Sequence, residues 1–294
     1  MEKYLTDLVS PGTVIRDVGV MQHTSTGYRA AGKRIATVPT MGALHEGHLE
    51  LIRRARRLAD IVVVSIFVNP TQFAPEEDLD KYPRPFEQDV ALAFREGADC
   101  IFAPAAQDMF PAGFDTGVSV EKASRPLEGA FRPTHFRGVA TVVAKLVNIT
   151  QPNIVVFGQK DGQQTVVVRR MLRDLNFPID LVVVPTVRDS DGLALSSRNV
   201  YLNPEQRREA PVLFESLALA RELIRHGERS CAAILHAMRA LIESKSSALI
   251  DYVSIADMDT LDEVNNLHEG NSIMISLAVR FGSTRLIDNI HVQL

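Results

Sequence analysis

The sequence predicts an α/β fold: a Rossmann-like doubly wound parallel sheet followed by a smaller C-terminal α+β domain. Strand-like and helical segments alternate over the first 185 residues, which is typical of a doubly wound sheet. The segment 61–68 is β-branched and apolar on both faces, as expected for a strand that is covered on both sides. After residue 199 the pattern changes to two helical segments and then three strand-like segments.

The elements of the first domain, residues 1–185, follow from its apolar segments and from the breaks between them. The segment 121–134 is predicted to be a loop because it contains two prolines and one glycine. We expect helices at 13–34, 49–58, 85–96, 136–149 and 163–175, and strands at 35–41, 61–68, 100–103, 153–157 and 180–185.

The second domain is predicted to comprise residues 186–294, with the boundary near Pro185. Its first helix begins at Pro204, and proline is favoured at the first helical position. We expect helices at 204–225 and 230–245, and strands at 251–255, 272–281 and 285–292.

Composition narrows the class of protein. The chain of 294 residues is 46% hydrophobic and 23% charged, as in ordinary globular proteins, and its net charge of -4 gives no general attraction to nucleic acid or to anionic membranes. No apolar segment is long enough to span a bilayer, and the N-terminus lacks an apolar signal core. Cys100 and Cys231 have no metal-like spacing and are expected to be reduced. We therefore expect a cytoplasmic protein with no nucleic-acid or membrane partner.

The segment 45–48, His-Glu-Gly-His, lies between the predicted strand 35–41 and the following helix. It places two imidazoles on one face of a helix N-terminus, where free N–H groups and a partial positive charge attract anions. Such groups can hold a triphosphate and stabilise charge at its α-phosphate. A His-Glu-x-x-His zinc motif is excluded because Leu49 occupies the second histidine position. A His-x-x-His pair alone is often only a helix cap, but Gly47 and the preceding strand favour nucleotide binding.

Two further segments carry phosphate-binding side chains. The segment 158–161, Gly-Gln-Lys-Asp, follows a predicted strand, and its Lys160 can reach phosphate oxygens as a point charge. The segment 196–198, Ser-Ser-Arg, offers two hydroxyls and a guanidinium near the domain boundary, as a mobile phosphate clamp would. Taken alone, the first segment is more often only a polar turn, and a helix cap accounts equally well for the second.

Four neutral hydrogen-bonding side chains suit a small hydroxylated carboxylate as the second substrate. A pocket for a phosphorylated acceptor would more naturally carry several arginines or lysines. The four residues are Asn69, Gln72, His135 and Gln164.

Six segments, in order over nearly the whole chain, resemble the pantothenate synthetase (pantoate–β-alanine ligase) family. They are residues 39–48, 67–73, 132–139, 158–164, 191–199 and 284–289. One departure is Gly162, where members of the family often have a larger residue.

The resemblance implies an ATP-dependent ligase of the nucleotidyltransferase superfamily, usually a homodimer that uses Mg²⁺. His48 would take the catalytic position, and Gln72 and Gln164 would bind pantoate. Asp89 and Asp161 are candidate magnesium ligands, although the resemblance does not assign the metal site. The catalytic group would comprise His45, His48, Lys160, Ser196, Ser197 and Arg198. The ATP site would comprise Met41, Gly42, Ala43, Leu44, His45, Glu46, Gly47, His48, Gly158, Gln159, Lys160, Asp161, Val187, Leu195, Ser196, Ser197 and Arg198.

The chemistry that the family implies has two steps. The carboxylate of (R)-pantoate attacks the α-phosphate of ATP, which gives pantoyl adenylate and pyrophosphate. The amine of β-alanine then displaces AMP and forms pantothenate, for coenzyme A biosynthesis. The segment 121–135 is a candidate cover for the adenylate. The alternative functions are a nucleotidyltransferase acting on a phosphorylated acceptor and a non-catalytic nucleotide sensor.

Overall fold

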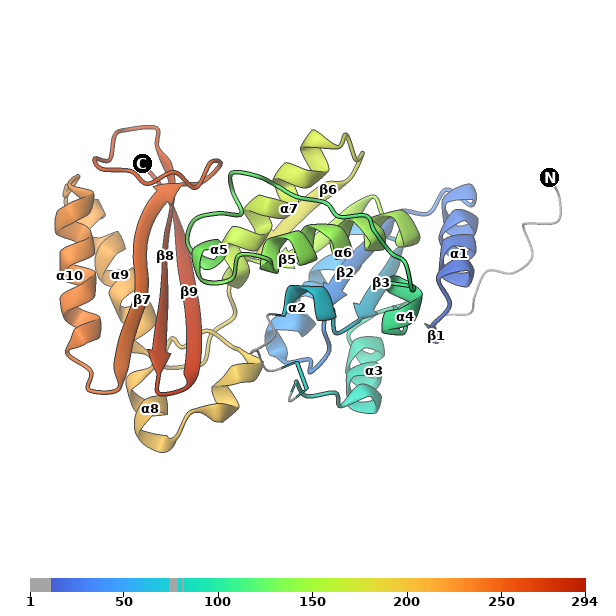
Figure 1. Ribbon diagram of the computed structural model, residues 1–294, viewed down its shortest axis with the longest axis horizontal. Helices are drawn as coiled ribbons and strands as arrows, with labels where there is room; N and C mark the ends of the chain where they lie inside the picture. Colours follow the sequence, from blue (N-terminus) through green and yellow to red (C-terminus); the bar gives the residue numbers. More distant parts are fainter. Residues whose placement is uncertain (1–11, 74–78, 81) are drawn as a thin grey trace. The chain divides into compact units, whose positions relative to one another are not determined.

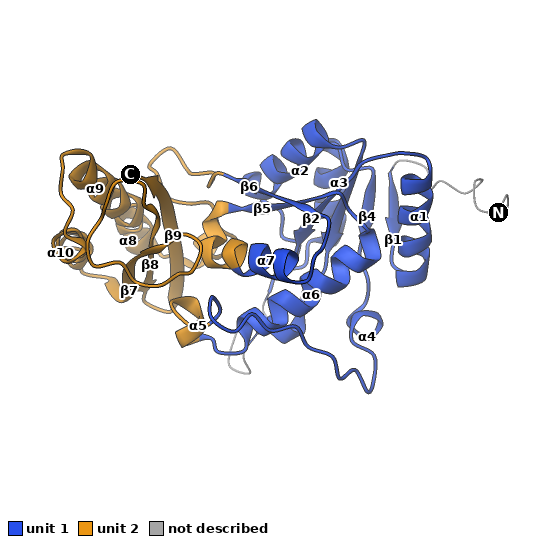
Figure 2. Ribbon diagram, turned by 90° about the horizontal axis from the view of Figure 1, so that it is seen from above, with its two compact units in different colours: residues 1–124, 132–158, 167–184 blue, residues 125–131, 159–166, 185–294 orange. Residues whose placement is uncertain are grey.

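The computed structural model describes residues 12–73, 79–80 and 82–294. The chain divides into two compact units (Figure 2). Unit 1 comprises residues up to 124 together with 132–158 and 167–184, and unit 2 comprises 125–131, 159–166 and 185–294. Two short segments from before residue 185 are therefore part of unit 2.

Unit 1 is built on a six-stranded sheet whose strand pairs are all parallel (Figure 1). The strand order is β1-β4-β3-β2-β5-β6. From β2 the chain continues to its neighbour β3 and then to β4, toward one edge of the sheet, whereas from β5 it continues to β6 at the other edge. The switch point of the sheet therefore lies between β2 and β5. The strands are β1 Thr13–Ile15, β2 Ile35–Thr40, β3 Ile61–Ile66, β4 Cys100–Phe102, β5 Ile154–Gly158 and β6 Asp180–Val184.

Helices cover both faces of this sheet. Within unit 1, α2 and α3 lie on one face and α6 lies on the other, with α1 packed against α6 (Figure 2). The buried side of α2 carries Leu49, Ile52 and Ala55, whose spacing of three residues gives one apolar stripe. The helices that begin in the first 185 residues are α1 Val18–Ala30, α2 Glu46–Leu58, α3 Phe86–Arg95, α4 Ala106–Met109, α5 Glu128–Phe131, α6 His135–Thr150 and α7 Gly162–Asp174.

Unit 2 contains a three-stranded antiparallel sheet in the order β7-β8-β9. Helices α9 and α10 pack on it around a core that includes Leu217, Met238 and Phe281. The strands are β7 Ala248–Asp257, β8 Ser272–Phe281 and β9 Thr284–Gln293, and the helices are α8 Pro204–Glu209, α9 Val212–Arg225 and α10 Cys231–Glu243. The predicted doubly wound sheet and the smaller α+β part are confirmed. Within the described residues, none of the helices is long and apolar enough to cross a membrane.

Two predicted helices are wrong in part. The predicted helix 13–34 begins with strand β1, because its three residues pair in parallel with β4, and α1 starts only after Asp17, whose carboxylate accepts the N–H of Val20 at 2.8 Å. The predicted helix 204–225 is two helices, α8 and α9, separated at Ala210 and Pro211. Proline has no N–H for a helical hydrogen bond, so a second helix begins there.

The predicted loop 121–134 is wrong over one short segment, where α5 forms at residues 128–131. A buried ion pair holds this helix. The carboxylate of Glu128 accepts two hydrogen bonds from the Arg285 guanidinium, at 2.6 and 2.8 Å. The contact that stabilises α5 thus comes from Arg285 of strand β9, and the sequence near residue 128 does not indicate it.

The two cysteines are free thiols, and both are buried in the core of their own unit. Burial raises the pKa of Cys100 to about 12 and also raises the pKa of Cys231. Because the thiolate is the reactive form, neither thiol should react readily at neutral pH.

We therefore predict that the native protein reacts with an aromatic disulfide reagent at pH 8 far more slowly than after denaturation in guanidinium chloride. The denatured chain should titrate both of its thiols, Cys100 and Cys231. Rapid reaction of either thiol in the native protein would contradict its burial.

Candidate functional site

The loop 41–45 leaves the carboxyl end of β2, next to the switch point of the sheet, and leads into α2. Its backbone is unusual at Gly42 and Ala43, where φ is +83° and +49°. The hydroxyl of Thr40 accepts the N–H of Gly42 at 3.2 Å and donates to the carbonyl of Ser65 at 2.7 Å. The end of β2 is thereby tied to its neighbour β3 at the point where the loop begins.

Asp89 of α3 holds the rest of this loop. Its two carboxylate oxygens accept the N–H groups of Ala43 and Leu44, at 2.8 and 2.7 Å, and the residue is 1% exposed. Burial raises the pKa of Asp89, and the two backbone N–H groups oppose that shift. In the structure, both oxygens of Asp89, which the sequence offers as a candidate magnesium ligand, support the backbone of the loop.

The two histidines cap α2. His45 is the N-cap residue, and its Nδ1 accepts the N–H of Gly47 at 3.2 Å. Its own N–H donates to Nδ1 of His48 at 3.4 Å, so the two rings form a reciprocal capping box. Because both Nδ1 atoms act as acceptors, the proton of each neutral ring lies on Nε2. The helix-cap interpretation is therefore correct, and it also places on each ring an Nε2–H donor of the kind that an anion requires.

The ring positions also explain the glycine of this motif. The ring centroids of His45 and His48 lie 4.1 Å apart. A Cβ at position 47 would come within 2.9 Å of Cε1 of His45, so only glycine leaves room for the capping ring. Glu46 pairs with Arg53, which lies two turns further along the same helix.

Gln72 joins this part of the site. Its amide Nε2 lies 2.9 Å from Sδ of Met41, and its Oε1 accepts a hydrogen bond at 3.0 Å from the buried Asn69. The backbone carbonyl of Gln72 is held by the Arg132 guanidinium at 3.0 Å and by Nδ1 of His135 at 2.8 Å. The structure therefore brings together Gln72, Asn69 and His135, three of the four residues that the sequence offers for a hydroxylated carboxylate, and adds Arg132.

Unit 2 carries the lysine turn of the predicted site. Gly158 ends β5, and Gln159–Asp161 form a single 3₁₀ turn, called η3, before α7. Nζ of Lys160 lies 4.0 Å from the half-exposed carboxylate of Asp161, a separation at which an exposed pair is weak. Gln164 lies half-buried in the first turn of α7.

The serine-arginine segment also lies in unit 2, after a small hairpin. Arg188 and Ala194 form an antiparallel bridge, and the N–H of Leu195 donates to the carbonyl of Val187 at 3.0 Å. Oγ of Ser196 accepts the N–H of Arg198 at 3.2 Å and caps the 3₁₀ helix η4, Ser197–Tyr201. The capping interpretation of this segment is therefore correct for Ser196. The predicted site residues are thus divided between the two units.

A parallel sheet with a switch point, followed by a helix N-terminus that carries two histidines, defines a Rossmann-like α/β protein of the nucleotide-binding type. The model of the family described as pantoate-beta-alanine ligase matches residues 13–291. The chain therefore belongs to the pantoate–β-alanine ligase family and is an enzyme of that family, as the resemblance predicted.

Relatives and solved structures of the same family are similar to this chain over most of its length. The pantothenate synthetase of Chloroherpeton thalassium is 49% identical over 282 residues, which cover 96% of this chain and 99% of that protein. The pantothenate synthetase of Roseiflexus castenholzii is 57% identical over 255 residues, which cover 87% and 91%. The crystal structure of pantothenate synthetase from Thermus thermophilus has a TM-score of 0.88 at 46% identity and covers 96% of this chain and 100% of its own.

A second structure is that of a pantoate-beta-alanine ligase from Francisella tularensis, described as complexed with beta-gamma ATP and beta-alanine. It has a TM-score of 0.74 at 31% identity and covers 95% of this chain and 97% of its own.

The close packing of the loop 41–45 against Asp89 can be tested by a substitution at Gly42, with Gly32 as a matched control. Alanine at either position is strained by about 1–2 kcal/mol, because φ is +83° at Gly42 and +72° at Gly32. At Gly42 the new Cβ would also lie 2.9 Å from Oδ2 of Asp89, whereas nothing lies within 4 Å at Gly32. We predict that Gly42→Ala lowers the melting temperature more than Gly32→Ala does.

The same pair of variants should separate in ATP titration calorimetry. Gly42→Ala should weaken ATP binding by roughly tenfold or more because it moves the loop. Gly32→Ala should bind ATP like the parent enzyme. Equal effects of the two variants on both measurements would mean that the loop has no special role.

Proposed function

We propose that this enzyme condenses (R)-pantoate with β-alanine at the expense of ATP, giving pantothenate, AMP and pyrophosphate through a pantoyl adenylate. The observation that carries the proposal is the segment 41–48, in which His45 and His48 cap the start of α2 beside the switch point of the sheet. The structure of the Francisella enzyme, which is described as complexed with beta-gamma ATP and beta-alanine, supports the same substrates for this chain.

In the first proposed step, an oxygen of the pantoate carboxylate attacks the α-phosphorus of ATP. A P–O bond to the carboxylate forms, the bond to the β-phosphate oxygen breaks, and pyrophosphate leaves. The carboxylate is already deprotonated at neutral pH, so the step requires no general base. The enzyme must instead hold two anions together and stabilise the charge that develops on the leaving group.

We assign that role to the cationic and N–H donor groups of the predicted ATP site. They are the N-terminus of α2 with the Nε2–H groups of its two histidines, Lys160, and the hydroxyl and guanidinium groups of the segment 196–198. The ATP contacts that we propose are Met41, Gly42, Ala43, Leu44, His45, Glu46, Gly47, His48, Gly158, Gln159, Lys160, Asp161, Val187, Leu195, Ser196, Ser197 and Arg198.

In the second proposed step, the amine of β-alanine attacks the acyl carbon of the adenylate. A C–N bond forms, the C–O bond to the phosphate breaks, AMP leaves and the nitrogen loses a proton. We propose that Gln72 and Gln164 hold pantoate through its hydroxyls and carboxylate. The contacts of the Gln72 amide with Asn69 and Met41, which hold it in one orientation, support this proposal.

Magnesium is proposed to arrive with ATP and to neutralise part of the triphosphate charge. Among the residues that the structure describes, no group of three or more His, Cys, Asp and Glu side chains is arranged to hold a metal ion. Mg²⁺ often uses one or two carboxylates together with substrate phosphates, and the half-exposed Asp161 suits such a role. That the protein forms a homodimer and that it lies in the cytoplasm are predictions from the sequence.

The proposed reaction predicts the products of a simple omission experiment. AMP should form from ATP only when pantoate and β-alanine are both present, and pantothenate should form in equal amount. Transfer of AMP to a phosphorylated acceptor would favour the alternative nucleotidyltransferase. ATP binding with no pyrophosphate release would favour a nucleotide sensor.

His48 is predicted to act mainly in the first step, where charge builds on the departing pyrophosphate. Loss of one such donor typically lowers kcat by about a hundred- to a thousandfold. In rapid-quench single turnover, His48→Ala should slow pyrophosphate release by a factor of that order. It should slow the reaction of supplied pantoyl adenylate with β-alanine much less, because pyrophosphate has already left.

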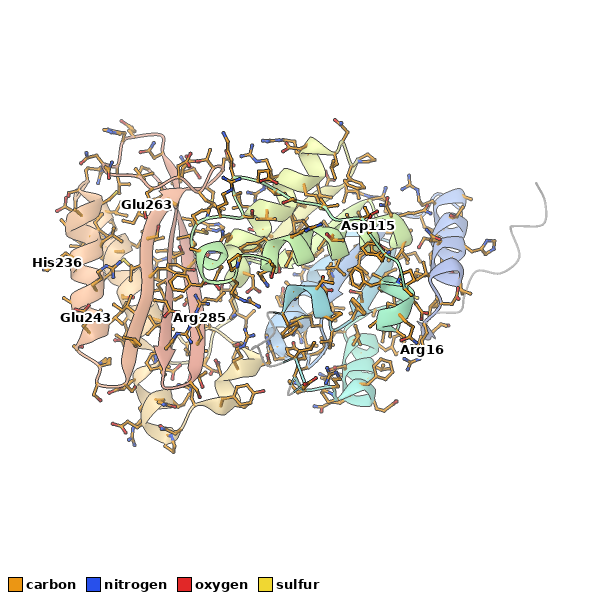
Figure 3. The ribbon with its side chains drawn as sticks, viewed as in Figure 1. Arg16, Asp115, His236, Glu243, Glu263 and Arg285 are labelled. Atoms are coloured by element: carbon orange, nitrogen blue, oxygen red, sulfur yellow. The ribbon has the colours of Figure 1, made fainter. Side chains whose placement is uncertain are left out.

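His236, an exposed histidine of α10, offers a control (Figure 3). His236→Ala should leave both half-reactions unchanged. If His48→Ala slowed both half-reactions by the same large factor, its proposed role at the pyrophosphate would be wrong.

A further inference from the structure

Two adjacent polar residues on β9, Asp288 and Asn289, are almost completely buried, with 2% and 3% of their surface exposed. Neither has a part in the proposed chemistry. Neighbouring residues of a strand point to opposite faces of a sheet, so these two side chains contact different parts of the unit. A buried polar side chain is costly unless it forms hydrogen bonds, and the partners of this pair are therefore informative.

Asn289 holds the lysine turn. Its amide Nδ2 donates to the backbone carbonyls of Gln159 and Lys160, each at 2.9 Å. Both acceptors are carbonyl oxygens, which identifies the facing amide atom as the nitrogen and uses both of its hydrogens. A Cβ at Gly162 would lie 3.0 Å from this nitrogen and 2.6 Å from Sδ of Met274, so glycine leaves the space in which the amide sits.

Asp288 holds the hairpin that precedes the serine-arginine segment. Its carboxylate accepts two hydrogen bonds from Arg188, at 2.5 and 2.9 Å. Arg188 also donates to the carbonyl of Gly192 at 3.1 Å and lies over the Phe214 ring at 4.0 Å. The guanidinium thus has a fixed plane at the base of the hairpin.

The two residues are coupled to each other and to the lysine. The N–H of Asn289 donates to Oδ1 of Asp288 at 2.8 Å. Burial raises the pKa of Asp288, and the positive charges of Arg188 and Lys160 oppose that shift. The charge of Lys160 therefore acts on the same carboxylate that orients the hairpin.

We propose that Asp288 and Asn289 are positioning residues for the reaction. Asn289 sets the turn that carries Lys160, and Asp288, through Arg188, sets the hairpin that leads to Ser196, Ser197 and Arg198. One strand thus fixes the spacing of two groups that must meet the same triphosphate. The inference rests on the proposed function, in which these groups contact ATP, and it adds residues that touch no substrate.

The role of Asn289 can be separated from a general structural role by a double-mutant cycle with Lys160→Ala. Asn289→Asp has nearly the same shape but places a carboxylate against two carbonyl oxygens. Misplacement by about 1 Å can cost roughly a hundredfold in rate. In the parent enzyme, Asn289→Asp should therefore slow single-turnover AMP formation by about ten- to a hundredfold.

In the Lys160→Ala background the same substitution should cost less than about threefold, because the group that Asn289 positions is already absent. The same four proteins are then compared by their ATP dissociation constants. These are measured by calorimetry, and the measurement requires neither pantoate nor β-alanine. Gln293→Glu is the matched control: it changes an exposed amide of the same strand that donates to the Gly270 carbonyl at 3.3 Å. It should leave rate and affinity near those of the parent enzyme.

Equal losses in the two backgrounds, or no loss in the parent enzyme, would overturn the proposal. Asn289→Ser, which is smaller and uncharged, is carried through the same cycle in case Asn289→Asp does not fold. Failure of both variants to fold would assign Asn289 to stability alone and would also overturn it. A parent enzyme that binds ATP but forms no AMP would defeat the proposed function, while the affinity cycle would still test the positioning role.

Discussion

The contact between the Asp89 carboxylate and the N–H groups of Ala43 and Leu44 is the constraint on which the proposed site depends most. The loop needs two successive residues with positive φ, Gly42 and Ala43, and a free chain would rarely adopt that conformation. Burying a carboxylate is also unfavourable, but two N–H donors offset that cost and at the same time hold the loop. The histidine cap of α2 begins directly after this loop, so its position is set by a residue of α3.

A comparable constraint organises unit 2. The guanidinium of Arg285, which is labelled in Figure 3, pairs with Glu128 and also donates to Asp251 at 2.6 Å. The Tyr252 hydroxyl donates to Glu128 at 2.9 Å. Breaking a buried pair of this kind by removing one partner typically costs about 3–5 kcal/mol. These contacts explain why the segment 125–131 belongs to unit 2 although it precedes residue 185.

The segment 159–166 belongs to unit 2 for a related reason. The amide of Gln163 donates to the carbonyl of Pro126 at 2.7 Å and accepts the N–H of Glu128 at 2.9 Å, while Asn289 holds the preceding turn. Lys160 is therefore attached to the same unit as the segment 196–198. In the proposed reaction, the phosphate-binding groups of unit 2 would act as one set, and those of α2 in unit 1 as another.

The fold class, the family and the residue types of the proposed site can all be read from the amino-acid sequence. The apolar, β-branched run at 61–66 forms the covered strand β3, and the glycine between the two histidines is a local requirement of their capping geometry. The side chains that hold these elements in place become known only from the folded chain. Asp89 lies 46 residues from Ala43 and Asn289 lies 130 residues from Gln159, and a pattern of neighbours along the chain does not specify such partners. The same reason explains the strand at Thr13–Ile15, which is too short for its periodicity to be recognised and exists because β4 supplies its hydrogen bonds.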